Sequence, residues 1–259
     1  MHRLTYLNDH LKNGRLIRWP DQCFPLNVYI APCTFYSLSD IDKYKYMGMV
    51  REALRIWQSV GDGKFSFNIV NSLNESNMNV EWRRVDRKSL GNCSFCFDND
   101  SRLYSAEVSI GISDGLLHQK YMDENEVFHT ILHEIGHALG LGHSTNTEDI
   151  MYTPHQYGVT SLSKGDIQSV RWLYTLPYGT SVNGLNEAYS INYKNLDDII
   201  MHLVNERTES SFQKTMRSVK IPQRNLQEEQ DKLAQIKKFH MSIQNIRLPK
   251  EIADKFKER

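Results

Sequence analysis

The spacing of apolar and polar residues predicts alternating strands and helices over most of the chain before Leu176. From Ser39 onward, apolar side chains recur at steps of three and four. This period predicts a long helix, capped by Ser39 or Asp40 and ended by Gly61-Asp62-Gly63. Partial alternation of apolar and polar residues predicts strands at 25–30, 65–70 and 78–82. A strand, a long helix and two more strands favour a mixed sheet with the helix packed on one face.

Two further stretches, 92–97 and 102–112, predict a hairpin. The residues that connect them, Asp98-Asn99-Asp100-Ser101, are typical of turns. An acidic cluster of this kind could also bind calcium, but no complete ligand loop surrounds it. We therefore predict a turn, and the sequence lends calcium no further support.

After the hairpin and the segment that follows it, Ser163 predicts the start of another helix, with Asp166 close to a capping-box arrangement. Beyond the boundary at 176–179, apolar residues at helical spacing predict two more helices, around 196–203 and 233–246. We interpret this tail as a helical appendage packed on the main domain. A module for a partner or an acidic surface is the alternative, because residues 206–259 hold 13 Lys+Arg and 8 Asp+Glu, a net +5.

Length and composition narrow the class of protein. A chain of 259 residues has room for one sizeable domain and something smaller. Its net charge of zero favours neither nucleic acid nor an anionic membrane as a partner. No apolar run approaches the length of about 18 residues that a membrane-spanning helix needs. The first residues, 1–6, lack the apolar core of a signal peptide, so the protein stays in the cytoplasm or its signal has been removed.

The clearest chemical pattern lies between Thr130 and Tyr152 and reads His133-Glu134-x-x-His137-x-x-Gly140-x-x-His143. Residues four apart lie on one helix face, about one turn apart, so His133 and His137 can hold one metal ion. Gly140 can end the helix and turn the chain back, since glycine tolerates positive φ, and His143 can then complete the triangle. Glu134 lies about 100° around the helix from His133, where it can reach a water on the metal.

Three neutral imidazoles suit zinc and leave a fourth position for water. Bound zinc lowers the pKa of this water to about 7, and a neighbouring carboxylate can take its proton. The chemistry implied is hydrolysis of an amide. Two histidines on a helix could instead serve packing or solubility, but Gly140, His143 and the downstream Met151 together argue against that alternative.

This segment resembles the metzincin zinc endopeptidases. Ser144 directly after the third histidine, followed by Met151-Tyr152, is most similar to the matrixin branch. The resemblance implies one catalytic zinc ion, a zinc-bound water activated by a glutamate, and a peptide or protein substrate. The residues it assigns are the zinc ligands His133, His137 and His143, the general base Glu134, the Met-turn residue Met151, and Pro154 and Tyr157 in the substrate cleft.

The likeness spans about Trp19 to Tyr174 and implies an α+β zincin fold. This fold has a twisted, mainly parallel five-stranded sheet, an active-site helix and a C-terminal helix. We expect an N-terminal leader at 1–18, the matrixin-like protease domain at 19–176 and a helical extension at 177–259. The outer strand of the hairpin is expected to form the upper rim of the cleft, where an extended substrate adds as a further strand.

The chain departs from the usual matrixin pattern in two places. Gly165 stands where the family usually has an aspartate. The segment that holds a second, structural zinc has no equivalent here, so we expect a bacterial-type matrixin domain. The nearby spare imidazoles, His118 and His129, are interpreted as surface or packing residues.

The four cysteines do not have the spacing of a four-cysteine zinc site: Cys23, Cys33, Cys93 and Cys96. Disulfides from the early pair to the later pair and free thiols both stay open. Two functions also stay open: an active endopeptidase, and a catalytically silent zinc-binding interaction protein. The resemblance favours a secreted or cell-surface protein, with the cytoplasm as the alternative. No nucleic-acid partner is expected, and the sequence does not decide the oligomeric state.

Overall fold

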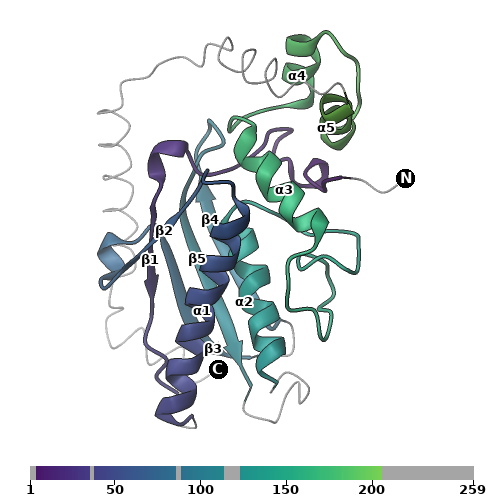
Figure 1. The fold of residues 1–259 in the computed structure, drawn as a ribbon. Coiled ribbons are helices and arrows are strands. Elements are labelled where there is room, and N and C mark those ends of the chain that lie inside the picture. Colours follow the sequence, from purple (N-terminus) through teal and green to yellow (C-terminus); the bar gives the residue numbers. More distant parts are fainter. Residues whose placement is uncertain (1–3, 36–37, 86–88, 114–122, 206–259) are drawn as a thin grey trace, which may run out of the picture. The chain divides into compact units, whose positions relative to one another are not determined.

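One five-stranded sheet organises the molecule, in the order β2-β1-β3-β5-β4 (Figure 1). The structure, a computed structural model, describes residues 4–35, 38–85, 89–113 and 123–205. The strands are β1 (Leu26–Ile30), β2 (Phe67–Val70), β3 (Met78–Arg84), β4 (Gly91–Phe97) and β5 (Leu103–Ile112). All neighbouring pairs are parallel except β4 and β5, which are antiparallel. The predicted mainly parallel sheet is confirmed.

The connection between β4 and β5 is a turn, as predicted. The Asp98 carboxylate accepts hydrogen bonds from the backbone N–H groups of Asp100 and Arg102, at 2.9 and 3.1 Å. The Arg102 guanidinium also pairs with the carboxylates of Asp98 and Asp100, at 2.6 and 3.2 Å. The two acidic side chains therefore serve the turn and its arginine.

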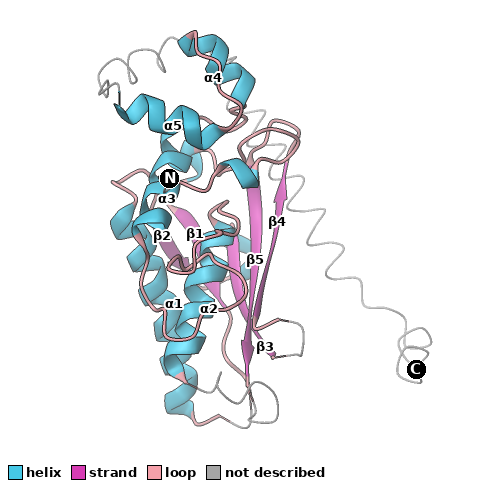
Figure 2. Cartoon of the chain, turned by 90° about the vertical axis from the view of Figure 1, so that its right-hand side faces the viewer, coloured by secondary structure: helices cyan, strands magenta, loops and turns pink. Residues whose placement is uncertain are grey.

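Two helices, α1 (Asp40–Val60) and α2 (Glu124–Ala138), cover one face of the sheet (Figures 1 and 2). The predicted cap of α1 is confirmed, because Ser39 accepts a hydrogen bond from the backbone of Asp42. The apolar stripe of α1 is buried, and within it the Trp57 indole N–H donates to the Leu132 carbonyl of α2 at 3.0 Å. This bond fixes α2 against α1.

Helix α3 (Lys164–Thr175) begins with the capping box that the sequence predicts, between Ser163 and Asp166. The buried Asp166 also accepts from the Ile150 N–H and from the Tyr6 hydroxyl, both at 2.8 Å. Strand β2 starts two residues later than predicted. Phe65, just before it, is buried, and the centroid of its ring lies 4.8 Å from that of Tyr174.

The N-terminal segment takes part in the core, which its interpretation as a leader did not predict. Four of its apolar side chains are buried: Tyr6, Leu7, Leu16 and Ile17. It contacts the chain beyond α3, where the Leu16 N–H donates to the Thr180 carbonyl and the Gly179 N–H donates to the Leu16 carbonyl, both at 2.8 Å. Buried residues thus lie on both sides of the boundary predicted at Trp19.

Helices α4 (Val182–Tyr189) and α5 (Leu196–Asn205) follow α3. The predicted amphipathic helix around 196–203 is confirmed as α5, with Leu196, Ile199, Ile200 and Leu203 buried. The chain divides into two units, Met1–Met216 and Arg217–Arg259, and the predicted helix at 233–246 lies outside the described residues. The division at 18/19 and 176/177 stays a prediction.

Two simpler observations complete the fold. No disulfide bond joins any of the four cysteines, all of which the structure describes: Cys23, Cys33, Cys93 and Cys96. Among the helices that the structure describes, none is long and apolar enough to cross a membrane.

Candidate metal centre and cleft

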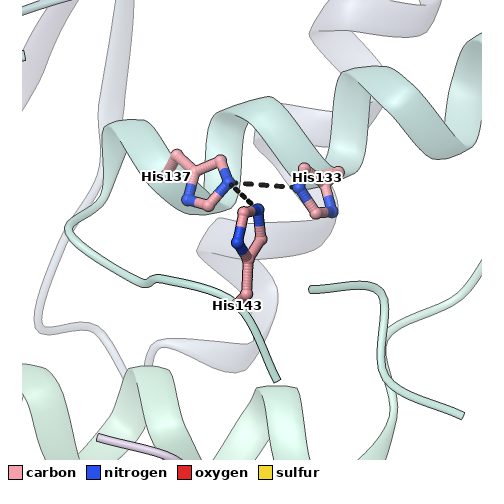
Figure 3. A group of neighbouring side chains, drawn as sticks. All are labelled: His133, His137 and His143. Carbon is pink, nitrogen blue, oxygen red and sulfur yellow. Dashed lines mark hydrogen bonds between the residues drawn. The ribbon is translucent and has the colours of Figure 1, made fainter. Parts of the chain in front are cut away.

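Helix α2 presents two histidines toward one point because its other side is held in the core. Asp123 caps the helix by accepting a hydrogen bond from the backbone of Asn125. Ile131, Leu132 and Ile135 are fully buried, so the rotation of the helix about its axis is determined by packing. His133 and His137, one turn apart, then lie on the same side of the helix (Figure 3).

Gly140 provides the turn that brings in the third histidine. Its φ of +102° is one that other residues rarely adopt, and a Cβ atom there would lie 2.8 Å from the Ile17 carbonyl oxygen. The chain therefore reverses immediately after α2. His143 returns to the rings of His133 and His137 from the following loop (Figure 3).

The three imidazoles converge through their Nε2 atoms, and His137 Nε2 lies 3.1 Å from His133 Nε2 and 3.2 Å from His143 Nε2. The Nδ1 atoms of His133 and His137 lie 2.8 Å from the carbonyls of Ile150 and Leu141. Because a carbonyl only accepts, both Nδ1 atoms carry the proton, and both Nε2 atoms offer lone pairs. Such nitrogens repel one another unless a cation lies between them.

The spacing and charge state of these donors fit zinc. Two nitrogens bound tetrahedrally at the usual zinc distance are about 3.3 Å apart, close to the contacts seen here. Burial lowers the pKa of His133 to about 3 and that of His137 to about 4, and it also lowers the pKa of His143. All three rings are therefore neutral at pH 7, which is the form that binds metal.

Glu134 lies beside the triad and is 6% exposed. Burial raises the pKa of its carboxyl to about 8, while the Arg83 guanidinium lowers it. A dication at the histidines would add to the effect of Arg83 and favour the charged carboxylate. The strand opposite leaves room for this side chain because residue 91 is a glycine. A Cβ atom on Gly91 would lie 2.6 Å from Glu134 Oε1 and 2.7 Å from Thr130 Cγ2.

Met151 packs against α2 and is fully buried. Its sulfur packs so closely on Gly136 that any Cβ atom there would overlap it. The backbone around Met151 also supports the site, since its carbonyl accepts from the Ser144 N–H at 2.8 Å and the preceding Ile150 carbonyl binds His133. The segment Ile150-Met151 therefore connects the loop after His143 with the ring of His133.

Ser144 and Ser163 both donate to the buried carboxylate of Asp149, which links the loop after His143 to the start of α3. A Cβ atom on Gly165 would lie 2.8 Å from Asp149 Oδ1. An aspartate at 165 would therefore bring a second carboxylate against Asp149. This crowding explains the glycine at this position.

The histidines open into a cleft of about 1290 Å³. One wall is formed by residues 89–93 at the start of β4, which is an edge strand of the described sheet. Pro154 and Tyr157 line the cleft, as does His129, whose Nδ1 lies 2.7 Å from the Val159 carbonyl. His118 lies outside the described residues.

His155 lies in the predicted stretch from Pro154 to Tyr157, lines the cleft and pairs with the buried Glu126 at 2.7 Å. Sequence reasoning missed the part of the cleft that the N-terminal segment forms. The N-terminal residues Asp9, His10 and Lys12 line it as well. Helical spacing gave no signal for these residues, because they lie in the N-terminal segment, more than 100 residues before the helix that carries His133 and His137.

The sheet, the helix that carries two histidines, the returning loop and the buried methionine together define a metzincin-type domain. Comparison with known families agrees: the family model described as Matrixin matches residues 32–175, more than half of the chain. The chain therefore belongs to the matrixin family and carries a matrixin-type metalloproteinase domain.

Individual relatives are distant. A protein of Trichoplusia ni ascovirus 2c, named as a matrix metalloproteinase, is 25% identical over 182 residues, which are 58% of this chain and 34% of that protein. A protein of Invertebrate iridescent virus 3 with a similar name is 43% identical over 67 residues, 25% of this chain and 18% of that one. Interstitial collagenase B of Mus musculus is 27% identical over 153 residues, 54% of this chain and 32% of the collagenase. The chain thus spans about a third or less of the length of these relatives.

Proposed function

We propose that the protein is a zinc-dependent endopeptidase. The observation that carries this proposal is the convergence of three neutral imidazole nitrogens beside a buried carboxylate, in a cleft bordered by an edge strand. In this proposal His133, His137 and His143 hold the metal. When bound, zinc lowers the pKa of a water ligand to about 7 and polarises the carbonyl of the substrate.

Glu134 moves the proton in this reaction. Two carboxylates line the cleft among the described residues, Asp9 and Glu134, and Glu134 is the one adjacent in sequence to a metal-binding histidine. As general base it takes a proton from the attacking water, and as general acid it passes that proton to the nitrogen of the leaving amine. The C–N bond breaks, and the products are a carboxylic acid and an amine.

The edge of β4 gives the substrate its direction in the cleft. Its outer N–H and C=O groups can pair with any extended peptide, so main-chain hydrogen bonds supply affinity regardless of side chains. Pro154 and Tyr157, which line the cleft, are proposed to contact the residue after the scissile bond. Met151 is proposed as the Met-turn residue that supports the histidines from below.

The proposal extends to location and to domains. We propose that the protein acts outside the cell or at its surface, which its family membership supports, and fractionation with an antibody checks this. The catalytic part is proposed at 19–176. The second candidate function is a catalytically silent zinc-binding protein on the same scaffold, because the metal site by itself does not require turnover.

Glu134→Gln separates the two functions. An amide keeps the shape of the side chain but cannot take a proton, so kcat on a fluorogenic peptide should fall by about 10²–10⁴-fold. Zinc content should be unchanged, because residue 134 is not proposed as a ligand. Glu124→Gln on the same helix is the matched control. Glu124 is the first residue of α2 and pairs with Lys45 of α1.

A chelator should abolish cleavage by the wild-type protein, and added zinc should restore it. Near-normal turnover by Glu134→Gln would refute the mechanism. A wild-type protein that binds zinc but cleaves no member of a peptide library would favour the silent zinc-binding protein.

A further inference from the structure

Hydrogen bonds join the first described segment of the chain, at residues 5–8, to the last described helix, α5. The Asp197 carboxylate of α5 is 1% exposed and accepts hydrogen bonds from the Thr5 hydroxyl and from the backbone N–H groups of Leu7 and Asn8, the latter two at 3.0 and 3.4 Å. In return, the Asn8 side chain accepts from the N–H of Leu196, the first residue of α5, at 2.9 Å. Each segment satisfies polar groups that the other would leave unpaired on burial.

The segment held in this way carries His10 to the metal centre. Residues Asn8–His10 form a short 3-10 helix directly after the contact with Asp197. The His10 ring lies so close to Gly142 that a Cβ atom there would lie 2.6 Å from His10 Cγ and would overlap Nδ1. Its ring also hydrogen-bonds to the backbone of His143. Residue 142 must therefore be glycine for His10 to reach this position.

Packing alone does not account for a histidine here. His10 Nε2 is buried and has no hydrogen-bond partner among the described residues. A buried polar atom without a partner costs about 1–3 kcal/mol. A phenylalanine ring would fill the same space without this cost, so the useful polar contact of His10 is the one toward His143.

His143 is the histidine that needs such support. The rings of His133 and His137 are oriented by hydrogen bonds from Nδ1 to the carbonyls of Ile150 and Leu141, respectively. Within the part of the chain that the structure describes, His143 Nδ1 makes no equivalent bond, and its side chain is exposed. Its position depends on the backbone of the loop, to which His10 is bound.

We propose that His10 is a positioning residue for His143, and that α5 acts on the metal centre by holding the segment that carries His10. This inference rests on the proposed function, since it assigns a supporting role at the same metal site. It makes α5, which lies beyond the proposed catalytic part, a contributor to metal affinity.

His10→Phe in the full-length protein tests the proposal directly. Zinc affinity, measured by competition with a chelating dye, should fall about 10–100-fold, the usual effect of losing a group that orients a metal ligand. The melting temperature of the metal-free protein should be unchanged or higher, because a buried nitrogen without a partner is removed. If the role of His10 were purely structural, His10→Phe would lower the melting temperature and leave zinc affinity unchanged. Unchanged zinc affinity would therefore overturn the proposal.

Asp197→Asn tests the role of α5. It should also weaken zinc binding, and in the His10→Phe background it should add little, because both changes act through the same contact. Asn8→Ala is the milder alternative if Asp197→Asn does not fold. His202→Ala, on α5 but next to Tyr193, is the matched control and should bind zinc normally.

If the losses of zinc affinity caused by His10→Phe and by Asp197→Asn added up fully in the double variant, the link through the N-terminal segment would be refuted. The outcomes are separable from those of the proposed function. If the wild-type protein takes up no zinc, the proposed function fails. If it binds zinc and cleaves peptides while His10→Phe binds zinc equally tightly, only this inference fails.

Discussion

Gly136 offers a sharp test of the contact between α2 and Met151. The residue lies inside α2, between the two histidines, where alanine would ordinarily be favourable. Replacing glycine by alanine inside a helix stabilises it by about 1 kcal/mol. Here, however, the added Cβ atom would overlap Met151 Sδ and lie 3.1 Å from Trp57 Cζ2 and 3.2 Å from Met151 Cε.

The cost of this overlap can be estimated. Met151 and Trp57 are both fully buried, so neither side chain can move into solvent. Overpacking by one carbon in such a core costs about 1–3 kcal/mol. After the helical gain of about 1 kcal/mol is subtracted, Gly136→Ala should destabilise the protein by roughly 0–2 kcal/mol.

Gly48 provides the matched control. It also lies inside a helix, α1, and a Cβ atom there meets nothing within 4 Å. Gly48→Ala should therefore stabilise the protein by about 1 kcal/mol. The two variants should differ by about 1–3 kcal/mol, or roughly 2–12 °C in Tm at about 2–4 °C per kcal/mol.

Thermal melts of both metal-free variants give the comparison, and zinc titration gives a second one. Displacement of Met151 shifts Ile150, whose carbonyl orients His133, so Gly136→Ala should also bind zinc more weakly. If Gly136→Ala melts as high as Gly48→Ala and binds zinc like wild type, the contact between Met151 and Gly136 does not support the three histidines.

Two further changes test the cleft and the chain ends. Gly91→Ala should lower kcat while zinc content stays normal, because the atoms nearest to the new methyl group belong to Glu134 and Thr130; peptide kinetics with metal analysis check this, and unchanged kcat would contradict the tight fit. A chain ended at Leu176 should be poorly soluble or melt at a much lower temperature. It would lose the buried apolar side chains of α5 and the hydrogen bonds from Thr5, Leu7 and Asn8 to Asp197, and it would expose the N-terminal segment to water; a melt matching that of the full chain would refute this.

Local interactions account for what the sequence could predict. The helix from Ser39, the capping box at Ser163 and Asp166, and the β4–β5 turn depend on groups within a few residues of one another. The histidine pattern belongs to the same class. A helix period and one glycine turn are enough to bring His133, His137 and His143 together, so their convergence followed from spacing alone.

Contacts between distant segments were decided only by the tertiary structure. The Thr5–Asp197 bond joins residues 192 positions apart, and no periodicity in either segment indicates the other. His10 reaches Gly142 for the same reason, which is why a polar N-terminus that reads as a leader contributes to the core and the cleft. Spacing along the chain specifies which residues share a helix face. Which surface that face meets depends on burial summed over the whole fold, and this sum placed the N-terminal segment beside the three histidines and against α5.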